Sequence, residues 1–135
     1  MKKPKRLAGS EWEIMEGVWQ RIDQAPPYGV TVREVHEHLY PEGQKAYTTV
    51  QTVMNILFEK GFLRREKIGL ANFYTPALSR EEMARHETRS LVSRAFGGSF
   101  VALASHLVDS GALSDKELAV LKDMIDAKER RQKQS

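Results

Sequence analysis

The 135-residue sequence contains no cysteine, so disulfide bonds and thiolate metal sites are excluded. No apolar run approaches the roughly 18 residues that a membrane span needs. No signal-peptide core follows the basic start of the chain. These absences predict a soluble, cytoplasmic protein without membrane insertion, built as one domain or as one domain with an appendage.

The sequence also lacks the patterns of common catalytic and cofactor sites. It has no Ser-His-Asp order, and the stretch FGGS lacks the strand and the lysine of a phosphate loop. His36 and His38 lie two positions apart on a predicted helix, so they point in different directions and cannot chelate one ion together. We therefore predict a protein that is not an enzyme and that uses no metal and no cofactor.

The net charge of +3 is unevenly distributed along the chain. Residues 1–6 carry four basic side chains and no acid, residues 7–42 carry a net charge of −5, and residues 43–67 return to +3. A second basic stretch, KERRQKQ, closes the sequence. Basic character gathered on a short arm and around one segment is typical of a surface that faces phosphates, although chance clustering on a solvated face gives the same pattern.

Helix start signals recur along the chain as capping boxes, in which a Ser or Thr and a Glu three residues later satisfy orphan N–H groups reciprocally. The four boxes begin at Ser10, Thr31, Ser79 and Ser114. They predict helices after each position, with breaks at the tandem prolines, at Gly97-Gly98 and at Gly111. Between them, FLRRE and NFYTP flank a glycine turn and predict a β-hairpin.

This order of elements predicts a mainly α fold with a small β-hairpin wing. Residues 1–78 are expected to form a winged helix-turn-helix DNA-binding domain, and residues 79–135 a helical dimerisation region with a basic tail. A protein that binds two symmetry-related half-sites in DNA must itself be two-fold symmetric. The apolar faces of the C-terminal helices are therefore predicted to form a homodimer. The dimerisation residues are predicted to be Leu91, Phe96, Phe100, Leu103, Leu107, Leu118, Leu121 and Ile125.

The segment YTTVQTVMNILFEKGF, residues 47–62, has an unusual solvent stripe. At helical spacing an apolar face lies opposite side chains that are short, neutral and able to hydrogen-bond. Asn and Gln can pair bidentately with adenine, and Thr can hydrogen-bond or touch the thymine methyl group. The predicted base-facing residues are Thr48, Gln51, Thr52 and Asn55, with Thr49 at the edge of the groove. The residues predicted to hold phosphates are Lys45, Tyr47, Arg64, Arg65 and Lys67.

Four segments then carry a resemblance: EWEIMEGVW, TVREVHEHL, AYTTVQTVMNILFEKGFLRREKIGLANFYTP and FGGSFVALASHLVDSGALSDKELAVLKDMI. In order and spacing, over roughly residues 7–127, they resemble the BlaI/MecI penicillinase-repressor family, which includes the copper-responsive CopY regulators. The resemblance implies a dimeric repressor on a dyad-symmetric operator in double-stranded DNA. With no cysteine, the chain lacks the cluster of the copper branch, and it has Ile56 where many relatives have Arg.

In the β-lactam branch of that family, a membrane sensor with a metalloprotease domain leads to cleavage of the repressor before a Phe in the early C-terminal helices. The resemblance places the corresponding bond at Ala95–Phe96, with the membrane sensor metalloprotease as a partner. This chain has Ala95 where those repressors have Asn.

Two other functions stay open at the level of sequence. The same helix face could dock a protein, and a pocket between the C-terminal helices could hold a small-molecule effector without protease control. Binding to duplex DNA that weakens steeply with salt favours the repressor over the interaction module.

Overall fold

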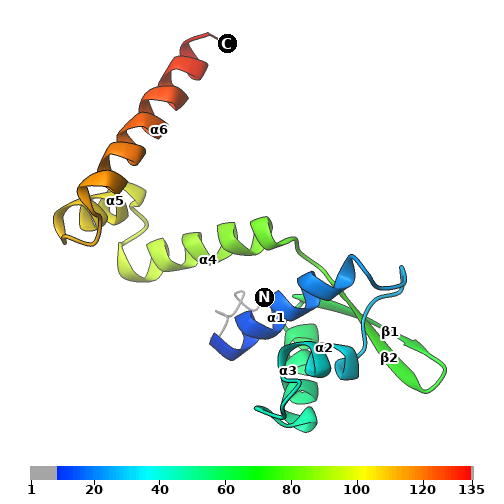
Figure 1. Cartoon of the computed structure of the whole chain (residues 1–135). Helices are drawn as coiled ribbons and strands as arrows, with labels where there is room; N and C mark the ends of the chain where they lie inside the picture. The colour runs from blue at the N-terminus through cyan, green and yellow to red at the C-terminus, as the bar shows by residue number, and fades with distance from the viewer. Residues whose placement is uncertain (1–8, 135) are drawn as a thin grey trace. The chain divides into compact units, whose positions relative to one another are not determined.

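The computed structural model describes residues 9–134, which form eight elements and divide into two compact units between Thr88 and Arg89 (Figure 1). The predicted fold class is confirmed: three helices, a two-stranded antiparallel hairpin and three further helices follow one another. The basic residues of the segment 1–6 lie outside the described residues. The elements are α1 (Gly9–Ile22), α2 (Val32–Leu39), α3 (Tyr47–Glu59), β1 (Leu63–Ile68), β2 (Ala71–Pro76), α4 (Arg80–Ala95), α5 (Phe100–Asp109) and α6 (Asp115–Lys133).

The core of the N-terminal unit lies where α1, α2 and α3 meet. Each helix contributes one apolar stripe, and the side chains at the centre of the core have no exposed surface at all. The fully buried residues are Ile14, Met15 and Val18 from α1, Val35 from α2, and Val50, Met54 and Leu57 from α3. This three-helix core leaves one face of α3 outside, and that face is the one predicted to read DNA.

Met83 of α4 is also fully buried in the N-terminal core. The first half of α4 therefore packs with this unit, which runs to Thr88. An ion pair between Arg80 and Glu16 (2.7 Å) joins the start of α4 to α1.

The hairpin is attached to the helices along its second strand. Val30, in the loop between α1 and α2, exchanges backbone hydrogen bonds with Tyr74 of β2 at 2.9 and 2.7 Å. Gly29 precedes that bridge with φ +115°, and a Cβ atom there would lie 2.3 Å from the Tyr74 carbonyl oxygen. Only glycine fits this approach, because any side chain would push the loop off the strand.

The tip of the hairpin is a two-residue turn. Ile68 pairs with Ala71, so Gly69 and Leu70 form the loop, and of these two only Gly69 has a positive φ (+64°). A positive φ at the first loop position alone is the signature of a type II′ turn. The predicted glycine turn is therefore confirmed, and it leaves Leu70 fully exposed.

Three of the four predicted capping boxes form. At Thr31, Ser79 and Ser114 the hydroxyl accepts a hydrogen bond from the backbone N–H of the Glu three residues later, whose carboxylate accepts one in return. The box predicted at Ser10 is wrong, because α1 already includes Gly9 and Ser10 lies inside the helix. Exposed Glu82 and Glu117 have lowered pKa values because these backbone hydrogen bonds favour the charged carboxylate.

The C-terminal unit consists of the end of α4 with α5 and α6. The turn after α4 closes with a hydrogen bond from the Gly98 N–H to the Val92 carbonyl (3.0 Å), and Gly97 takes a left-handed conformation. Ser99 then caps α5 by accepting from the Ala102 N–H. No single helix between residues 9 and 134 is long and apolar enough to cross a membrane; α4 and α5 together have that length and composition, but as a pair bent by 83°.

A nearly buried ion pair ties α1 to the end of α3. The Lys60 ammonium, at the C-cap of α3, donates to both carboxylate oxygens of Glu11 at 2.9 Å, and the two side chains are 18% and 11% exposed. Removing one partner of such a pair leaves the other charge poorly solvated. This contact fixes the end of α3 against the rest of the core.

Glu11→Ala is expected to lower the free energy of unfolding by about 2 kcal/mol, the scale of a charge-assisted hydrogen bond that leaves a desolvated partner. Urea unfolding at fixed protein concentration measures it. Glu81→Ala is the matched control, because Glu81 also lies in the first turn of a helix and pairs with a cation, Arg85, but on the open surface. The control is expected to cost less than about 0.5 kcal/mol. Equal losses in the two variants would contradict the role assigned to the Glu11 pair.

Candidate nucleic-acid interface

The exposed face of α3 follows from its buried face. Val50, Met54 and Leu57 have no exposed surface, so the residues opposite them must face outward. Thr48, Thr49, Gln51 and Thr52 are all exposed, as the sequence predicts for residues available to bases. Thr52 donates its hydroxyl proton to the Thr48 carbonyl at 2.9 Å, which is a bond within the helix that fixes its side-chain rotamer.

The start of α3 is held by the preceding helix rather than by a cap of its own. Ala46 occupies the N-cap position and offers no side-chain hydrogen bond. Instead, Nε2 of His36 in α2 donates to the Lys45 carbonyl at 2.7 Å, and the His36 ring lies edge-on to Tyr47 with centroids 6.0 Å apart. His36 is therefore a structural residue of the turn between α2 and α3.

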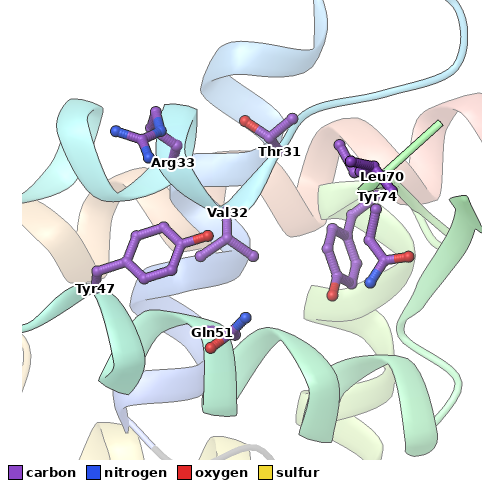
Figure 2. Close-up of a pocket in the computed structure, with 9 residues that line it drawn as sticks. Thr31, Val32, Arg33, Tyr47, Gln51, Leu70 and Tyr74 are labelled. Atoms are coloured by element: carbon purple, nitrogen blue, oxygen red, sulfur yellow. The ribbon is translucent and has the colours of Figure 1, made fainter. Parts of the chain in front are cut away.

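A hollow of about 390 Å³ lies between the first turn of α2, the exposed face of α3 and the tip of the wing. Figure 2 shows the side chains of Tyr47, Gln51 and Tyr74 around it, with the Tyr47 ring extending inward toward Val32. The residues that line it are Thr31, Val32, Arg33, Tyr47, Gln51, Leu70, Ala71, Asn72 and Tyr74. Two predicted contact residues, Tyr47 and Gln51, thus share one surface with both α2 and the wing.

Arg33 is a basic residue of this surface that was not among the predicted phosphate contacts. It lies in the first turn of α2, it is exposed, and its guanidinium carbon lies 6.0 Å from the centroid of the Tyr47 ring. Arg33 lies in the segment 7–42, whose net charge of −5 gave no indication of a basic surface. The capping box at Thr31 places residue 33 in the first turn of α2, but local sequence does not show that this turn lies beside α3.

Asn55 is placed differently from the other four residues of the predicted stripe. It is half-buried, and its Oδ1 atom accepts hydrogen bonds from the Tyr74 hydroxyl at 2.7 Å and from Arg65 Nη1 at 3.2 Å. Arg65 and Tyr74 are cross-strand partners in the wing. The structure therefore brings Asn55 together with the wing, whereas Gln51 and the threonines have open surface.

The basic residues of the wing lie on two opposite faces, because side chains alternate along a strand. Leu63 is buried and faces the helices, so Arg65 and Lys67 share its side of β1 and Arg64 lies on the other. Phe73 and Tyr28 pack against each other from that other side, edge to face at 4.8 Å. Arg64 and Arg65 were both predicted to hold phosphates, but the alternation of side chains along β1 places them on opposite faces of the hairpin.

Lys45 is partly committed to neighbours within the unit. Its ammonium lies 3.9 Å from a Glu13 carboxylate oxygen and 5.3 Å from the centroid of the Tyr40 ring. Burial raises the pKa of the Tyr40 hydroxyl, and the hydrogen bond it donates to Glu13 at 2.6 Å raises it further, so Tyr40 stays a neutral donor. Because of this ion pair, Lys45 is expected to attract a phosphate less strongly than an unpaired lysine would.

In the C-terminal unit, most of the predicted dimerisation residues leave much of their apolar surface uncovered within one chain. Phe96, Leu103 and Leu118 are half-buried and the others are exposed, reaching 55% for Phe100 and 59% for Ile125. A second hollow of about 390 Å³ lies between α5 and α6. The residues around it are Ala104, Leu107, Val108, Leu118, Leu121, Lys122, Ile125 and Asp126.

The predicted cleavage position lies at the end of a helix. Ala95 is the last residue of α4 and is exposed, and Phe96 begins the turn that continues with Gly97 and Gly98. The Phe96 ring is half-buried against His106 of α5, with centroids 5.6 Å apart.

Comparisons with known proteins identify relatives of this chain. Residues 7–127 match the penicillinase repressor family. The penicillinase repressor of Bacillus licheniformis is 23% identical over 99% of this chain and all of its own length. A 16.5 kDa protein from the ptsI 3′ region of Latilactobacillus sakei is 30% identical over 90% of this chain and 80% of its own. The transcriptional regulator BlaI of Mycobacterium tuberculosis is 35% identical over 62% of this chain and 56% of its own.

Among solved structures, the solution structure of monomeric BlaI from Bacillus licheniformis in complex with the blaP half-operator resembles 61% of this chain and 93% of that chain, with 27% identity and a TM-score of 0.45. The family match covers nearly all of the described helices, from α1 to the greater part of α6. The chain thus belongs to the penicillinase repressor family, a family of DNA-binding transcriptional repressors.

Proposed function

We propose that the protein is a sequence-specific repressor that binds a dyad-symmetric operator in double-stranded DNA as a homodimer, with the first two turns of α3 in the major groove. The observation that carries the proposal is the exposed, uncharged, hydrogen-bonding surface of Thr48, Thr49, Gln51 and Thr52 above a fully buried stripe. Side chains of this kind can approach base edges closely and match their donors and acceptors. The repressor would act in the cytoplasm, where it meets its operator.

The basic residues around α3 are proposed to hold the phosphates on either side of the groove. Arg33 and Tyr47 border the hollow from the side of the helices, and Arg65 and Lys67 lie on the helix-facing side of the wing. Phosphate contacts position a protein on the duplex, while base contacts select the sequence. Lys45 and Arg64 are proposed as weaker contacts, the first because of its ion pair with Glu13 and the second because it lies on the far face of the hairpin.

The C-terminal unit is proposed to form the homodimer. Its apolar hollow between α5 and α6 accepts side chains of a second copy, and the exposed apolar residues around it would be buried on both protomers at once. A two-fold dimer presents two α3 helices to two half-sites, which is the arrangement that a dyad-symmetric operator requires. Burial of these side chains would favour association through the hydrophobic effect.

Relief of repression is proposed to occur through cleavage of the Ala95–Phe96 bond by a membrane sensor metalloprotease. The bond lies at an exposed helix end, next to two left-handed glycines, where a chain segment can be drawn into a protease site. Cleavage there separates α5 and α6 from the DNA-binding unit and so removes the dimer contacts.

Gln51→Ala tests the placement of α3. The variant is expected to lose about 1–3 kcal/mol of affinity for the operator, roughly 5- to 150-fold, because one base contact is lost, while binding to random duplex stays unchanged. Fluorescence anisotropy with a duplex selected in vitro by the wild-type chain measures both affinities. Gln20→Ala, an exposed glutamine of α1, is the control. An unchanged ratio of specific to non-specific affinity in Gln51→Ala would contradict the placement.

Leu107→Asp tests the dimer interface. The substitution puts an unpaired charge into the hollow between α5 and α6, so the variant is expected to be monomeric at micromolar concentration by analytical ultracentrifugation. Ser105→Asp adds the same charge on the opposite side of α5, at an exposed and already polar position. That control is expected to remain dimeric. A dimeric Leu107→Asp protein would place the interface elsewhere.

Limited digestion with thermolysin, a zinc protease that cuts before large apolar residues, tests the accessibility of the Ala95–Phe96 bond. The first cut is expected there, and the cleaved protein is expected to be monomeric with reduced operator affinity. Phe96→Ala removes the recognised side chain and is expected to slow that cut, whereas Phe100→Ala, inside the first turn of α5, is expected to leave it unchanged. A first cut elsewhere, or full affinity after cleavage, argues against this mode of relief.

A further inference from the structure

We propose that Asn55 is a positioning residue that clasps the wing to α3 and aims Arg65 at a phosphate, rather than a reader of bases. The inference rests on the proposed DNA-binding function and assigns a specific role within it. It replaces the prediction, drawn from helical spacing alone, that Asn55 faces a base with the rest of the stripe.

The clasp is built from one oxygen atom and both strands of the wing. Tyr74 of β2 donates its hydroxyl proton to Asn55 Oδ1 at 2.7 Å, and Arg65 of β1 donates from Nη1 to the same atom at 3.2 Å. Because Arg65 and Tyr74 are directly paired across the hairpin, the two bonds hold one rung of the wing against α3. An arginine side chain can only donate, so the atom of the amide that faces it must be the oxygen.

This geometry determines which interactions Asn55 has left to offer. A carbonyl oxygen has two lone pairs, and both are used by the wing. Bidentate recognition of adenine requires the Asn oxygen to accept from the adenine amino group while the Asn nitrogen donates to N7. With the clasp closed, Asn55 has only its N–H donors free, and its side chain is already half-buried. It therefore cannot make the adenine contact that its residue type allows.

The clasp also orders Arg65. Its guanidinium carbon lies 4.1 Å from the centroid of the Phe58 ring, and Phe58 follows Asn55 by three residues on α3. Stacking on Phe58 and donation to Asn55 hold the guanidinium in one place, while Arg65 as a whole remains exposed with further N–H groups to offer. A cation held in this way loses little conformational freedom when it binds a phosphate.

Arg64 supplies the matched comparison. It is the neighbouring residue of the same strand, has the same charge and is exposed, but it points to the other face of the hairpin. Among the described residues its side chain makes no hydrogen bond or ion pair. Removal of Arg64 or Arg65 changes the net charge equally, so a difference between the two variants reports the position of the guanidinium rather than the total charge.

The experiment compares Asn55→Ala, Tyr74→Phe, Arg65→Ala and Arg64→Ala in the full chain, with the duplex selected in vitro by the wild type and with a random duplex. Asn55→Ala, Tyr74→Phe and Arg65→Ala are each expected to weaken binding to both duplexes by a similar factor, roughly 5- to 10-fold. Each is also expected to reduce the slope of log K against log salt by up to about 0.9, the value for one phosphate contact. Arg64→Ala is expected to have a smaller effect on both quantities.

Three further measurements separate the clasp from a simple packing role. Asn55→Ala introduced into Arg65→Ala is expected to cause no additional loss of affinity, since both act on the same phosphate contact. Selection of duplexes with Asn55→Ala is expected to recover the wild-type sequence at every position. In the absence of DNA, the Arg65 side-chain N–H signals are expected to lose protection from exchange in both Asn55→Ala and Tyr74→Phe, while the circular dichroism spectrum is retained.

The proposal is overturned if Asn55→Ala changes the selected base at one position while Tyr74→Phe leaves binding unchanged, because Asn55 would then read that base. It is also overturned if Asn55→Ala lowers stability but leaves the salt slope intact. A wild-type chain that shows no salt-dependent binding to any duplex would instead refute the proposed function itself, so the two failures are distinguishable.

Discussion

The buried stripe of α3 is the constraint on which the rest of the DNA-binding unit depends. Val50, Met54 and Leu57 are completely buried in the core that α3 forms with α1, α2 and the hairpin, and the Glu11–Lys60 pair fixes the end of the same helix. A helix held on one side in this way has no freedom to rotate about its axis. The identity of the outward-facing residues, and hence the surface offered to a partner, is determined by packing on the inner side.

Two neighbouring elements complete that surface, and each has a contact with α3. The turn before α3 is held by His36, and the wing after it is held by Asn55. The hollow bordered by Arg33, Gln51 and the wing therefore has walls that are each tied to the same helix. A fixed spacing between base-contacting and phosphate-contacting groups is what registration on a regular duplex requires.

Much of this organisation could be predicted from the sequence because it is encoded locally. The capping boxes at Thr31, Ser79 and Ser114 and the glycine turn at Gly69 depend on residues within three positions of one another, and all were found where expected. The box predicted at Ser10 did not form, because the same residue pattern lies inside α1 and Glu13 accepts a hydrogen bond from Tyr40 instead.

The features that could not be predicted depend on contacts between distant residues. The burial of Met83, which carries half of α4 into the N-terminal unit, is visible only once the helices are packed. The engagement of Asn55 by Tyr74 joins residues 19 positions apart, and helical periodicity alone placed Asn55 with Thr48 and Gln51. Arg33 was obscured for a similar reason, since a segment total of charge says nothing about which side chains reach the surface around α3.

The most direct test of the account is a map of backbone and side-chain amide chemical shifts in the full chain as duplex DNA is added. The largest changes are expected on residues 47–52, on the Gln51 side-chain amide, on the first turn of α2 and on the wing. Only small changes are expected over the outer face of α1. If the signals of residues 47–52 stay in place while those of α1 or of the C-terminal helices move, α3 does not read the duplex and the central claim is wrong.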